Sequence, residues 1–337
     1  MTSKIVFYKE VVGSYLKRIL RIGRNPVFAS LFFTRNCNMN CAYCKTARIP
    51  NIKKDLPVED WYNIIDLLHD WGLRHITIYG GEPTLRDDLP DLLKHCVKRR
   101  MLTHIVTNGK LLTEEYLSDL SYDYFLLGVS IDNLIPTNSS KKIYDENIIN
   151  LLKEHKKKFP DRIGYCINII VTKENIHNLL DIIRKINANL NTAFSIDPVH
   201  SAPHPNHPFL YRDYCGDLVL SINDLQWLAK IISVIKKHEI RIWGTNKYYS
   251  TMIDWFKGKY EWECDVGDLY FSINNDGTMM VCEETLTNYK IWDMEHFSSK
   301  ERHRKIKKFK LPGCKCVKPC YFMPSDLVKH PLKQFLP

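Results

Sequence analysis

Three cysteines lie close together near the start of the chain. Cys37, Cys41 and Cys44 occur in the segment CNMNCAYC, at spacings of four and three residues. A tetrahedral zinc site takes four ligands, and no second Cys-x-x-Cys pair follows within the next fifty residues. Three thiolates can instead hold three irons of a [4Fe–4S] cube and leave the fourth iron open to an outside ligand. The spacing therefore predicts an iron–sulfur cluster with one open position.

An alternation of strands and helices positions these cysteines. The expected strands are VFASLFFT, HITIYG, LTHIVT, YFLLGVSI, IGYCINIIV and TAFSI, and the expected helices cover 57–70, 88–99, 113–120, 140–158, 175–187 and 221–237. This rhythm predicts an α/β fold with a parallel sheet and right-handed crossovers. Six units fit the length better than eight, so we expect a partial (β/α)6 TIM-like barrel over residues 28–247. The cysteines follow the first strand directly, at the end where barrel enzymes build their active sites.

Two further regions flank the expected barrel. Residues 1–27 contain YKEVVGSYLKRILRIGR, which predicts a basic amphipathic helix. Its apolar face comprises Val12, Tyr15, Leu16, Ile19 and Leu20, and its cations are Lys17, Arg18, Arg21 and Arg24. This helix either packs on the barrel or contacts a membrane surface. Residues 248–337 lack the strand–helix rhythm and carry five cysteines, which predicts a small cysteine-rich C-terminal domain.

Composition sets broad limits on the class of protein. The 337 residues are 45% hydrophobic and 26% charged, which is ordinary for a globular protein. We expect a cytoplasmic protein, because the sequence shows neither a run of about 18 apolar residues nor a secretory signal pattern. Eleven cysteines then indicate metal ligands rather than disulfides. The net charge of +10 favours an anionic partner or surface, although we expect no nucleic acid.

The first cysteine motif resembles a known family. Cys-x-x-x-Cys-x-x-Cys with an aromatic residue, here Tyr43, before the last cysteine is similar to the signature of the radical S-adenosylmethionine (SAM) enzymes. In that family SAM chelates the open iron, and an electron from the reduced cluster cleaves its sulfonium bond. The resulting 5′-deoxyadenosyl radical abstracts hydrogen from a substrate. The resemblance implies an oxidoreductase or transferase that takes electrons from a reductant such as flavodoxin or ferredoxin.

Polar residues at the ends of other strands fit the same resemblance. It implies that Gly80, Gly81, Glu82 and Pro83 bind the methionine amino group, since glycines let the backbone approach closely. The other implied cofactor contacts are Thr107 and Asn108 for the carboxylate and ribose, Ser130 and Asp132 for the ribose hydroxyls, and Asn168 and the Val171 backbone for the sugar or adenine. Each of these short motifs alone is equally a turn or a cap.

A second group of cysteines lies near the C-terminus. The stretch Cys-x12-Gly-x4-Cys resembles the opening of the SPASM and twitch domains, which carry auxiliary iron–sulfur clusters. The implied ligands are Cys264, Cys282, Cys314, Cys316 and Cys320. Five cysteines rather than seven imply one auxiliary [4Fe–4S] cluster. The closing Cys-x-Cys-x3-Cys departs from the usual pattern, so the fourth ligand is either Cys314 or Cys316, and zinc held by the same thiolates is the alternative.

The remaining cysteines and histidines are less informative. Cys96 is expected to be a small core residue. Cys166, in the fifth strand, and Cys215, beside a loop over the barrel mouth, could each deliver a hydrogen atom to a substrate radical, or could simply be buried. That loop contains His200, His204 and His207, which we expect to be polar loop residues rather than metal ligands. The charge run at 301–310 is expected to be a solvated helix face.

Three substrate classes remain open at this point. The auxiliary domain favours a peptide, although no separate peptide-recognition domain of about 80 residues precedes the barrel. The segment YLKRILRIGRNP is similar to the start of hopanoid-type adenosyl transferases and favours a lipid or isoprenoid. A soluble small molecule, such as a sugar or cofactor precursor, is the third class. A non-catalytic iron–sulfur or zinc-binding module is the alternative of a different kind.

Overall fold

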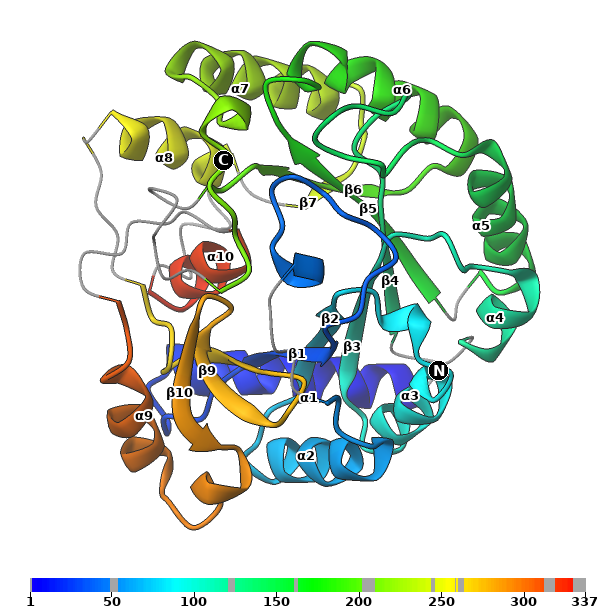
Figure 1. Cartoon of the computed structure of the whole chain (residues 1–337). Coiled ribbons are helices and arrows are strands. Elements are labelled where there is room, and N and C mark those ends of the chain that lie inside the picture. Colours follow the sequence, from blue (N-terminus) through cyan, green and yellow to red (C-terminus); the bar gives the residue numbers. More distant parts are fainter. Residues whose placement is uncertain are drawn as a thin grey trace.

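The strands of the computed structural model form one curved sheet (Figure 1). The structure describes residues 2–48, 54–120, 125–160, 163–201, 210–243, 246–257, 259, 264–311 and 319–329. Within them, the strand order is β10-β9-β8-β1-β2-β3-β4-β5-β6-β7. The strands are β1 (Phe28–Thr34), β2 (His75–Gly80), β3 (Leu102–Thr107), β4 (Phe125–Ser130), β5 (Ile163–Val171), β6 (Ala193–Pro198), β7 (Ile242–Trp243), β8 (Tyr270–Ile273), β9 (Thr278–Cys282) and β10 (Thr285–Lys290).

Helices flank this sheet, and most of them lie around its outer face (Figure 1). They are α1 (Thr2–Ile19), α2 (Val58–Asp70), α3 (Leu89–Lys98), α4 (Glu114–Asp119), α5 (Glu146–Lys158), α6 (Leu179–Leu190), α7 (Ile222–Lys237), α8 (Asn246–Phe256), α9 (Ser299–Lys307) and α10 (Pro319–Lys329). Short 3-10 turns cover Thr46–Arg48, Pro83–Leu85, Ile176–Asn178, Gly216–Leu218 and Trp292–Met294. Among the described residues, no helix combines the length and apolar character needed to cross a bilayer.

The alternation of side chains along the strands separates a core from an inner face. In β2, Ile76 and Ile78 are fully buried and pack in the main hydrophobic core. That core also receives Trp61, Ile64 and Leu68 of α2, which recur at helical spacing on one face of that helix. Their strand neighbours point the other way, toward the inside of the curved sheet. The mostly parallel α/β architecture expected from the sequence is confirmed.

Several expected boundaries are wrong. The helix expected over 140–158 begins only at Glu146, because Asp145 accepts a hydrogen bond from the Asn147 N–H and caps it. The helix expected over 175–187 covers 179–190 instead and follows a 3-10 turn. The helix expected from residue 8 begins earlier and ends at Ile19, just before Arg21 adopts a positive φ of 58°.

The cysteine-rich region continues the barrel sheet. The expected domain boundary, between residues 247 and 248, falls inside α8. After it, β8 pairs in parallel with β1, and β9 and β10 follow as antiparallel strands. The sequence pattern identifies no individual strand in this region, because four- to six-residue strands joined by tight turns lack the strand–helix rhythm. Cys314 and Cys316 lie outside the described residues, and Cys320 belongs to α10.

The helix α1 lies at the amino ends of the parallel strands. Its Glu10 carboxylate is 3.6 Å from the Arg74 guanidinium and 3.4 Å from that of Arg100, just before β2 and β3 begin. Its Arg18 pairs with Asp268 at 2.6 Å, just before β8 begins. In Figure 1 this helix crosses behind the strands. The cysteine segment follows the carboxyl end of β1, so the two lie at opposite ends of the barrel.

Candidate active site

Two glycines after β2 hold the start of the cysteine loop, residues 35–48, against the sheet. The Gly81 N–H donates to the Thr34 carbonyl at 2.8 Å, and the Glu82 N–H donates to the Asn36 carbonyl at 2.8 Å. A Cβ on Gly80 would lie 2.0 Å from the Thr34 carbonyl oxygen, and one on Gly81 would lie 2.0 Å from that of Asn36. Because no side chain fits there, only glycine allows this approach.

The Glu82 carboxylate ties the ends of two strands together. Its Oε1 accepts hydrogen bonds from the Thr84 N–H, the Thr84 hydroxyl and the Thr107 hydroxyl at 3.1, 2.7 and 2.7 Å. Its Oε2 accepts from the Asn108 N–H at 2.7 Å. The Asn108 side chain in turn donates to Asn38 in the cysteine loop at 2.7 Å. Glu82 is 1% exposed, and its hydrogen bonds stabilise the connection between the ends of β2 and β3.

Tyr43 and Asp132 join the cysteine loop to β4. The Tyr43 hydroxyl donates to Asp132 Oδ2 at 2.5 Å, and the Ser140 hydroxyl donates to the same oxygen at 2.6 Å. The other oxygen accepts from the Ile170 N–H at 2.9 Å. Burial, followed by the charge of Asp132, raises the pKa of Tyr43 well above its ordinary value. The carboxylate expected to contact ribose therefore anchors the residue that precedes Cys44.

The three thiols share one electrostatic environment. Burial raises the pKa of Cys37 above its usual value, and the charges of Glu82, Cys44 and Cys41 act in the same direction. The Lys142 ammonium lies 5.5 Å from the centre of the Tyr43 ring. Although burial alone would lower the pKa of Lys142, the charges of Asp132 and the three cysteines raise it. Sequence analysis missed this cation because residues 140–145 were expected to be helical.

A segment far along the chain also braces the cysteine loop. Cys44 and Arg212 form an isolated antiparallel bridge, and the Lys45 N–H donates to the Tyr211 carbonyl at 2.8 Å. Arg212 in turn pairs with the buried Glu284 carboxylate at 2.7 Å, just after β9. Within the loop, Arg48 donates to the carbonyl oxygens of Cys41, Ala42 and Cys44. The loop is thus held both by its own Arg48 and by groups from distant parts of the sequence.

The arrangement of the three thiols differs from that of a single-ion site. In the part of the chain that the structure describes, no three Cys, His, Asp or Glu side chains converge as ligands of one metal ion. Each thiolate of a [4Fe–4S] cube binds a different iron, so its ligands lie farther apart than those of a zinc ion. Three neighbouring thiols in one braced loop, with a lysine beside them, fit an anionic cube.

The remaining expected SAM contacts lie on β4 and β5. Ser130 and Asn168 are register partners on neighbouring strands. The Asn168 carbonyl accepts from the Ile131 N–H at 3.0 Å, and the Val171 carbonyl accepts from the Val199 N–H at 2.8 Å. Ser130 is 7% exposed and Val171 is fully buried. Together with the glycines after β2 and the pair Thr107 and Asn108, they lie at or near the carboxyl ends of four successive strands.

The two cysteines considered as hydrogen donors are both buried. Cys166, on β5, is 2% exposed, and burial raises its pKa to about 12. Its Sγ lies 3.8 Å from Asn168 Oδ1. Cys215 is 8% exposed, and its N–H donates to the Ser201 hydroxyl at 2.9 Å. His200 is half-buried, whereas His204 and His207 lie outside the described residues.

The described auxiliary cysteines lie around Tyr270. Cys264 Sγ is 3.4 Å from the Tyr270 hydroxyl. Ser272 pairs with Met280 across the antiparallel β8–β9 ladder, and continuing this register brings Cys282 opposite Tyr270. The same hydroxyl lies 3.5 Å from Ser325 of α10, the helix that contains Cys320. Three of the five expected ligands therefore lie on elements that contact or pair with β8.

A histidine on the inner face of β3 was not singled out from the sequence. His104 Nε2 is buried and has no hydrogen-bond partner among the described residues. Burial, with a smaller effect from His75, lowers its pKa to about 3. A Cβ on Gly128 would lie 2.6 Å from this nitrogen and 2.5 Å from Asn168 Nδ2. Gly128 thus leaves room for two polar side chains on the inner face of the sheet.

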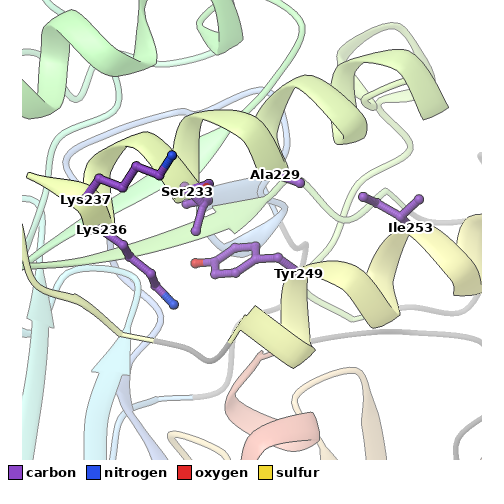
Figure 2. Close-up of a pocket in the computed structure, with 7 residues that line it drawn as sticks. Ala229, Ser233, Lys236, Lys237, Tyr249 and Ile253 are labelled. Carbon is purple, nitrogen blue, oxygen red and sulfur yellow. The ribbon is translucent and has the colours of Figure 1, made fainter. Parts of the chain in front are cut away.

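A separate groove lies between α7 and α8. It has a volume of about 480 Å³ and is lined by Ala229, Ile232, Ser233, Lys236, Lys237, Tyr249 and Ile253. Figure 2 shows the two lysines at the end of α7, with the Tyr249 ring below this helix. None of these residues belongs to the cysteine loop or to the strand ends around it, so the groove is distinct from the candidate active site.

Comparisons with known proteins agree with this geometry. Residues 31–186 match the profile of the radical SAM superfamily. A PqqA peptide cyclase from Bradyrhizobium diazoefficiens is 28% identical over 167 residues, which cover 47% of this chain and 43% of that protein. A 7-carboxy-7-deazaguanine synthase from Clostridium acetobutylicum is 27% identical over 236 residues, covering 68% of this chain and 91% of that protein.

Solved structures support the fold. SuiB from Streptococcus suis, bound to the precursor peptide SuiA, superposes with a TM-score of 0.64 and 17% identity, covering 92% of this chain and 72% of that one. The protein anSMEcpe with bound AdoMet superposes with a TM-score of 0.56 and 16% identity, covering 86% of each chain. The chain spans less than half the length of the PqqA peptide cyclases that it matches.

Proposed function

We propose that this chain is a radical SAM enzyme that cleaves SAM and abstracts hydrogen from a substrate. The observation that carries the proposal is the loop of Cys37, Cys41 and Cys44, braced at the carboxyl end of β1 beside the Gly80–Gly81 turn. A non-catalytic iron–sulfur or zinc module would need neither the open cluster corner nor the polar strand ends around it.

Each group of residues around the cysteine loop has its own proposed role in binding the cluster or SAM. Cys37, Cys41 and Cys44 hold the [4Fe–4S] cluster, which with SAM supplies a 5′-deoxyadenosyl radical when reduced. The Gly80–Gly81 turn brings backbone close to the methionine end of SAM, and Glu82 Oε2, which accepts one described hydrogen bond, can take a second from the ammonium group. Asn108, Ser130 and Asn168 offer polar groups to the rest of the cofactor. Lys142 contributes positive charge beside the thiolates.

One auxiliary [4Fe–4S] cluster completes the proposed cofactor set. Cys264, Cys282 and Cys320 are its surest ligands, with either Cys314 or Cys316 as the fourth. The support is the arrangement around Tyr270, which Cys264 contacts and which the β8–β9 register, continued by two residues, places opposite Cys282. A fully ligated cluster cannot bind substrate without losing a ligand, so an electron-relay or structural role follows. A flavodoxin or ferredoxin in the cytoplasm is the proposed reductant.

A peptide is the substrate class that we favour. The support comes from the names of the relatives, since PqqA peptide cyclases match the barrel and SuiB was solved with a precursor peptide. A soluble nucleoside-like molecule is the second candidate, because the deazaguanine synthase is matched over 91% of its length. If a peptide radical forms in the barrel, Cys166 and Cys215 remain the candidate hydrogen donors.

The test is SAM cleavage by the anaerobically reconstituted protein. Changing Cys37, Cys41 or Cys44 singly to Ala should abolish 5′-deoxyadenosine formation, measured by chromatography, while circular dichroism shows a folded chain. Cys96→Ala, which removes a core thiol remote from the loop, is the matched control and should retain cleavage. Undiminished cleavage in all three loop variants would refute the proposal.

A further inference from the structure

The helix α1 leaves an apolar stripe in solvent. Val12, Leu16 and Leu20 follow one another at four-residue spacing and are 51%, 47% and 64% exposed. Ile22, just after the helix, is 61% exposed. Scattered exposed apolar residues are normal on a protein surface, but Val12 and Leu16 lie on one side of α1, and Leu20 and Ile22 follow directly after it. We call them the α1 stripe.

The other side of α1, between Glu10 and Arg18, contacts the barrel. The exposed stripe therefore belongs to a helix that is already packed in the fold. Val11 is 8% exposed, and burial raises the pKa of Tyr15 to about 12. Arg18 pairs with Asp268, and Glu10 lies close to Arg74 and Arg100. These contacts fix which side of the helix faces the barrel and which faces outward.

Cations surround the α1 stripe. Lys9, Lys17, Arg21 and Arg24 are all exposed and lie in the same segment. Glu10 is the sole acidic residue between positions 9 and 25, and it is directed toward two arginines of the barrel. An apolar stripe flanked by cations is the pattern of a helix that lies in the interface of an anionic bilayer.

The same end of the barrel gathers further positive charge. Helices that follow parallel strands run back toward the amino ends of the strands, so their last turns face the side of α1. Those last turns carry Lys98 in α3, Lys156 to Lys158 in α5, and Lys236 and Lys237 in α7. The groove of Figure 2 therefore also lies at this end, with its two lysines.

We infer that the amino end of the barrel docks on an anionic lipid bilayer through the α1 stripe, with the cysteine loop facing away from the lipid. A second copy of the chain would bring like charges together, whereas anionic headgroups complement them. The inference does not depend on the proposed chemistry. If both hold, the active site of a membrane-bound enzyme opens to the aqueous phase, where it can receive a soluble substrate and an electron carrier.

Vesicle sedimentation tests the docking. The protein should sediment with vesicles of phosphatidylcholine mixed with phosphatidylglycerol, and much less with phosphatidylcholine alone. Binding should weaken as salt rises from about 0.01 to about 1 M, because the Debye length falls from about 30 to about 3 Å. Leu16→Glu with Leu20→Glu should reduce the partition coefficient at least about tenfold, since two leucines leave the interface and two anions enter it.

The vesicle experiment includes a matched control variant and separate measurements of folding and activity. Trp227→Glu changes an equally exposed apolar residue, on α7, and should leave binding and SAM cleavage unchanged. The leucine double variant should keep the wild-type circular dichroism spectrum and SAM cleavage in solution. Equal binding of the double variant and the wild type would overturn the inference. So would a concentration-dependent dimer, seen by analytical ultracentrifugation, that the double variant abolishes.

Hydrogen exchange on vesicles tests the orientation. Amides of residues 12–24 should exchange more slowly on anionic vesicles than in solution, and those of residues 35–48 should not change. Slower exchange in 35–48 without protection of 12–24 would show that the mouth of the barrel meets the lipid, and would overturn the proposed orientation. Because this readout needs neither cluster nor SAM, its failure is distinguishable from a failure of the proposed enzymatic function.

Discussion

Glu82→Gln tests the connection between the strand ends and the cysteine loop. The variant keeps one acceptor oxygen for Thr84 and Thr107, but turns an amide NH2 toward the Asn108 N–H. A buried donor left without a partner costs about 1–3 kcal/mol, and three hydrogen bonds lose their charge assistance. Neutralising a buried carboxylate offsets part of this loss. We expect the free energy of unfolding to fall by about 2–3 kcal/mol.

The assay is thermal and urea denaturation of the cluster-free protein, followed by circular dichroism. For a chain of this size, the expected loss lowers the melting temperature by about 3–5 °C. Glu115→Gln, an exposed carboxylate in the first turn of α4, is the control and should change stability by less than about 0.5 kcal/mol. The variant should also take up less iron on reconstitution, because Asn108 holds Asn38 in the cysteine loop. A Glu82→Gln protein as stable as the control would refute the reasoning.

Two further predictions concern the barrel interior and the auxiliary site. Burial lowers the pKa of His104 to about 3, so its contribution to stability is complete above about pH 6.5 and is lost as the pH falls from there toward about 3. Between about pH 7 and about pH 5, His104→Asn should therefore lose up to about 2 kcal/mol less stability than the wild type in urea denaturation, and equal losses would contradict the burial of a neutral imidazole. The reconstituted wild type should bind roughly eight irons, and the Cys37/Cys41/Cys44 triple Ala variant about four. Zinc in place of iron in that variant would rule out the auxiliary cluster.

The alternating part of the fold was readable from the sequence because each strand and helix there has its own periodicity. Mostly apolar, fully buried strands such as FASLFFT and amphipathic helices such as α2 need no distant partner to be identified. The strands β8, β9 and β10 were missed, since they are short and gain their definition from pairing with β1. Residues 140–145 were misassigned because apolar periodicity does not reveal that Ser140 bonds Asp132 instead of continuing a helix.

In the candidate site, too, local motifs can be predicted from the sequence, whereas tertiary contacts cannot. Its cysteines and its Gly80–Gly81 turn are local motifs that can be identified in the sequence alone. The residues that brace the loop, among them Arg48, Lys142, Arg212 and Glu284, have no motif. They come together only through tertiary contacts between segments far apart in the sequence. The role of Asp132 illustrates the limit, because a SID tripeptide suggests a ribose contact but says nothing about the Tyr43 hydroxyl.

The position of β1 in the sheet has a consequence for biosynthesis. This strand carries the cysteine loop and is paired on one side with β2, which is made soon after it, and on the other with β8, which is made late. Until the last third of the chain has left the ribosome, β1 is an edge strand, and Glu284 cannot reach Arg212. The loop is thus fully braced only at the end of synthesis. A cluster held by these cysteines would therefore gain the full support of the fold only after β8 and Glu284 have been made.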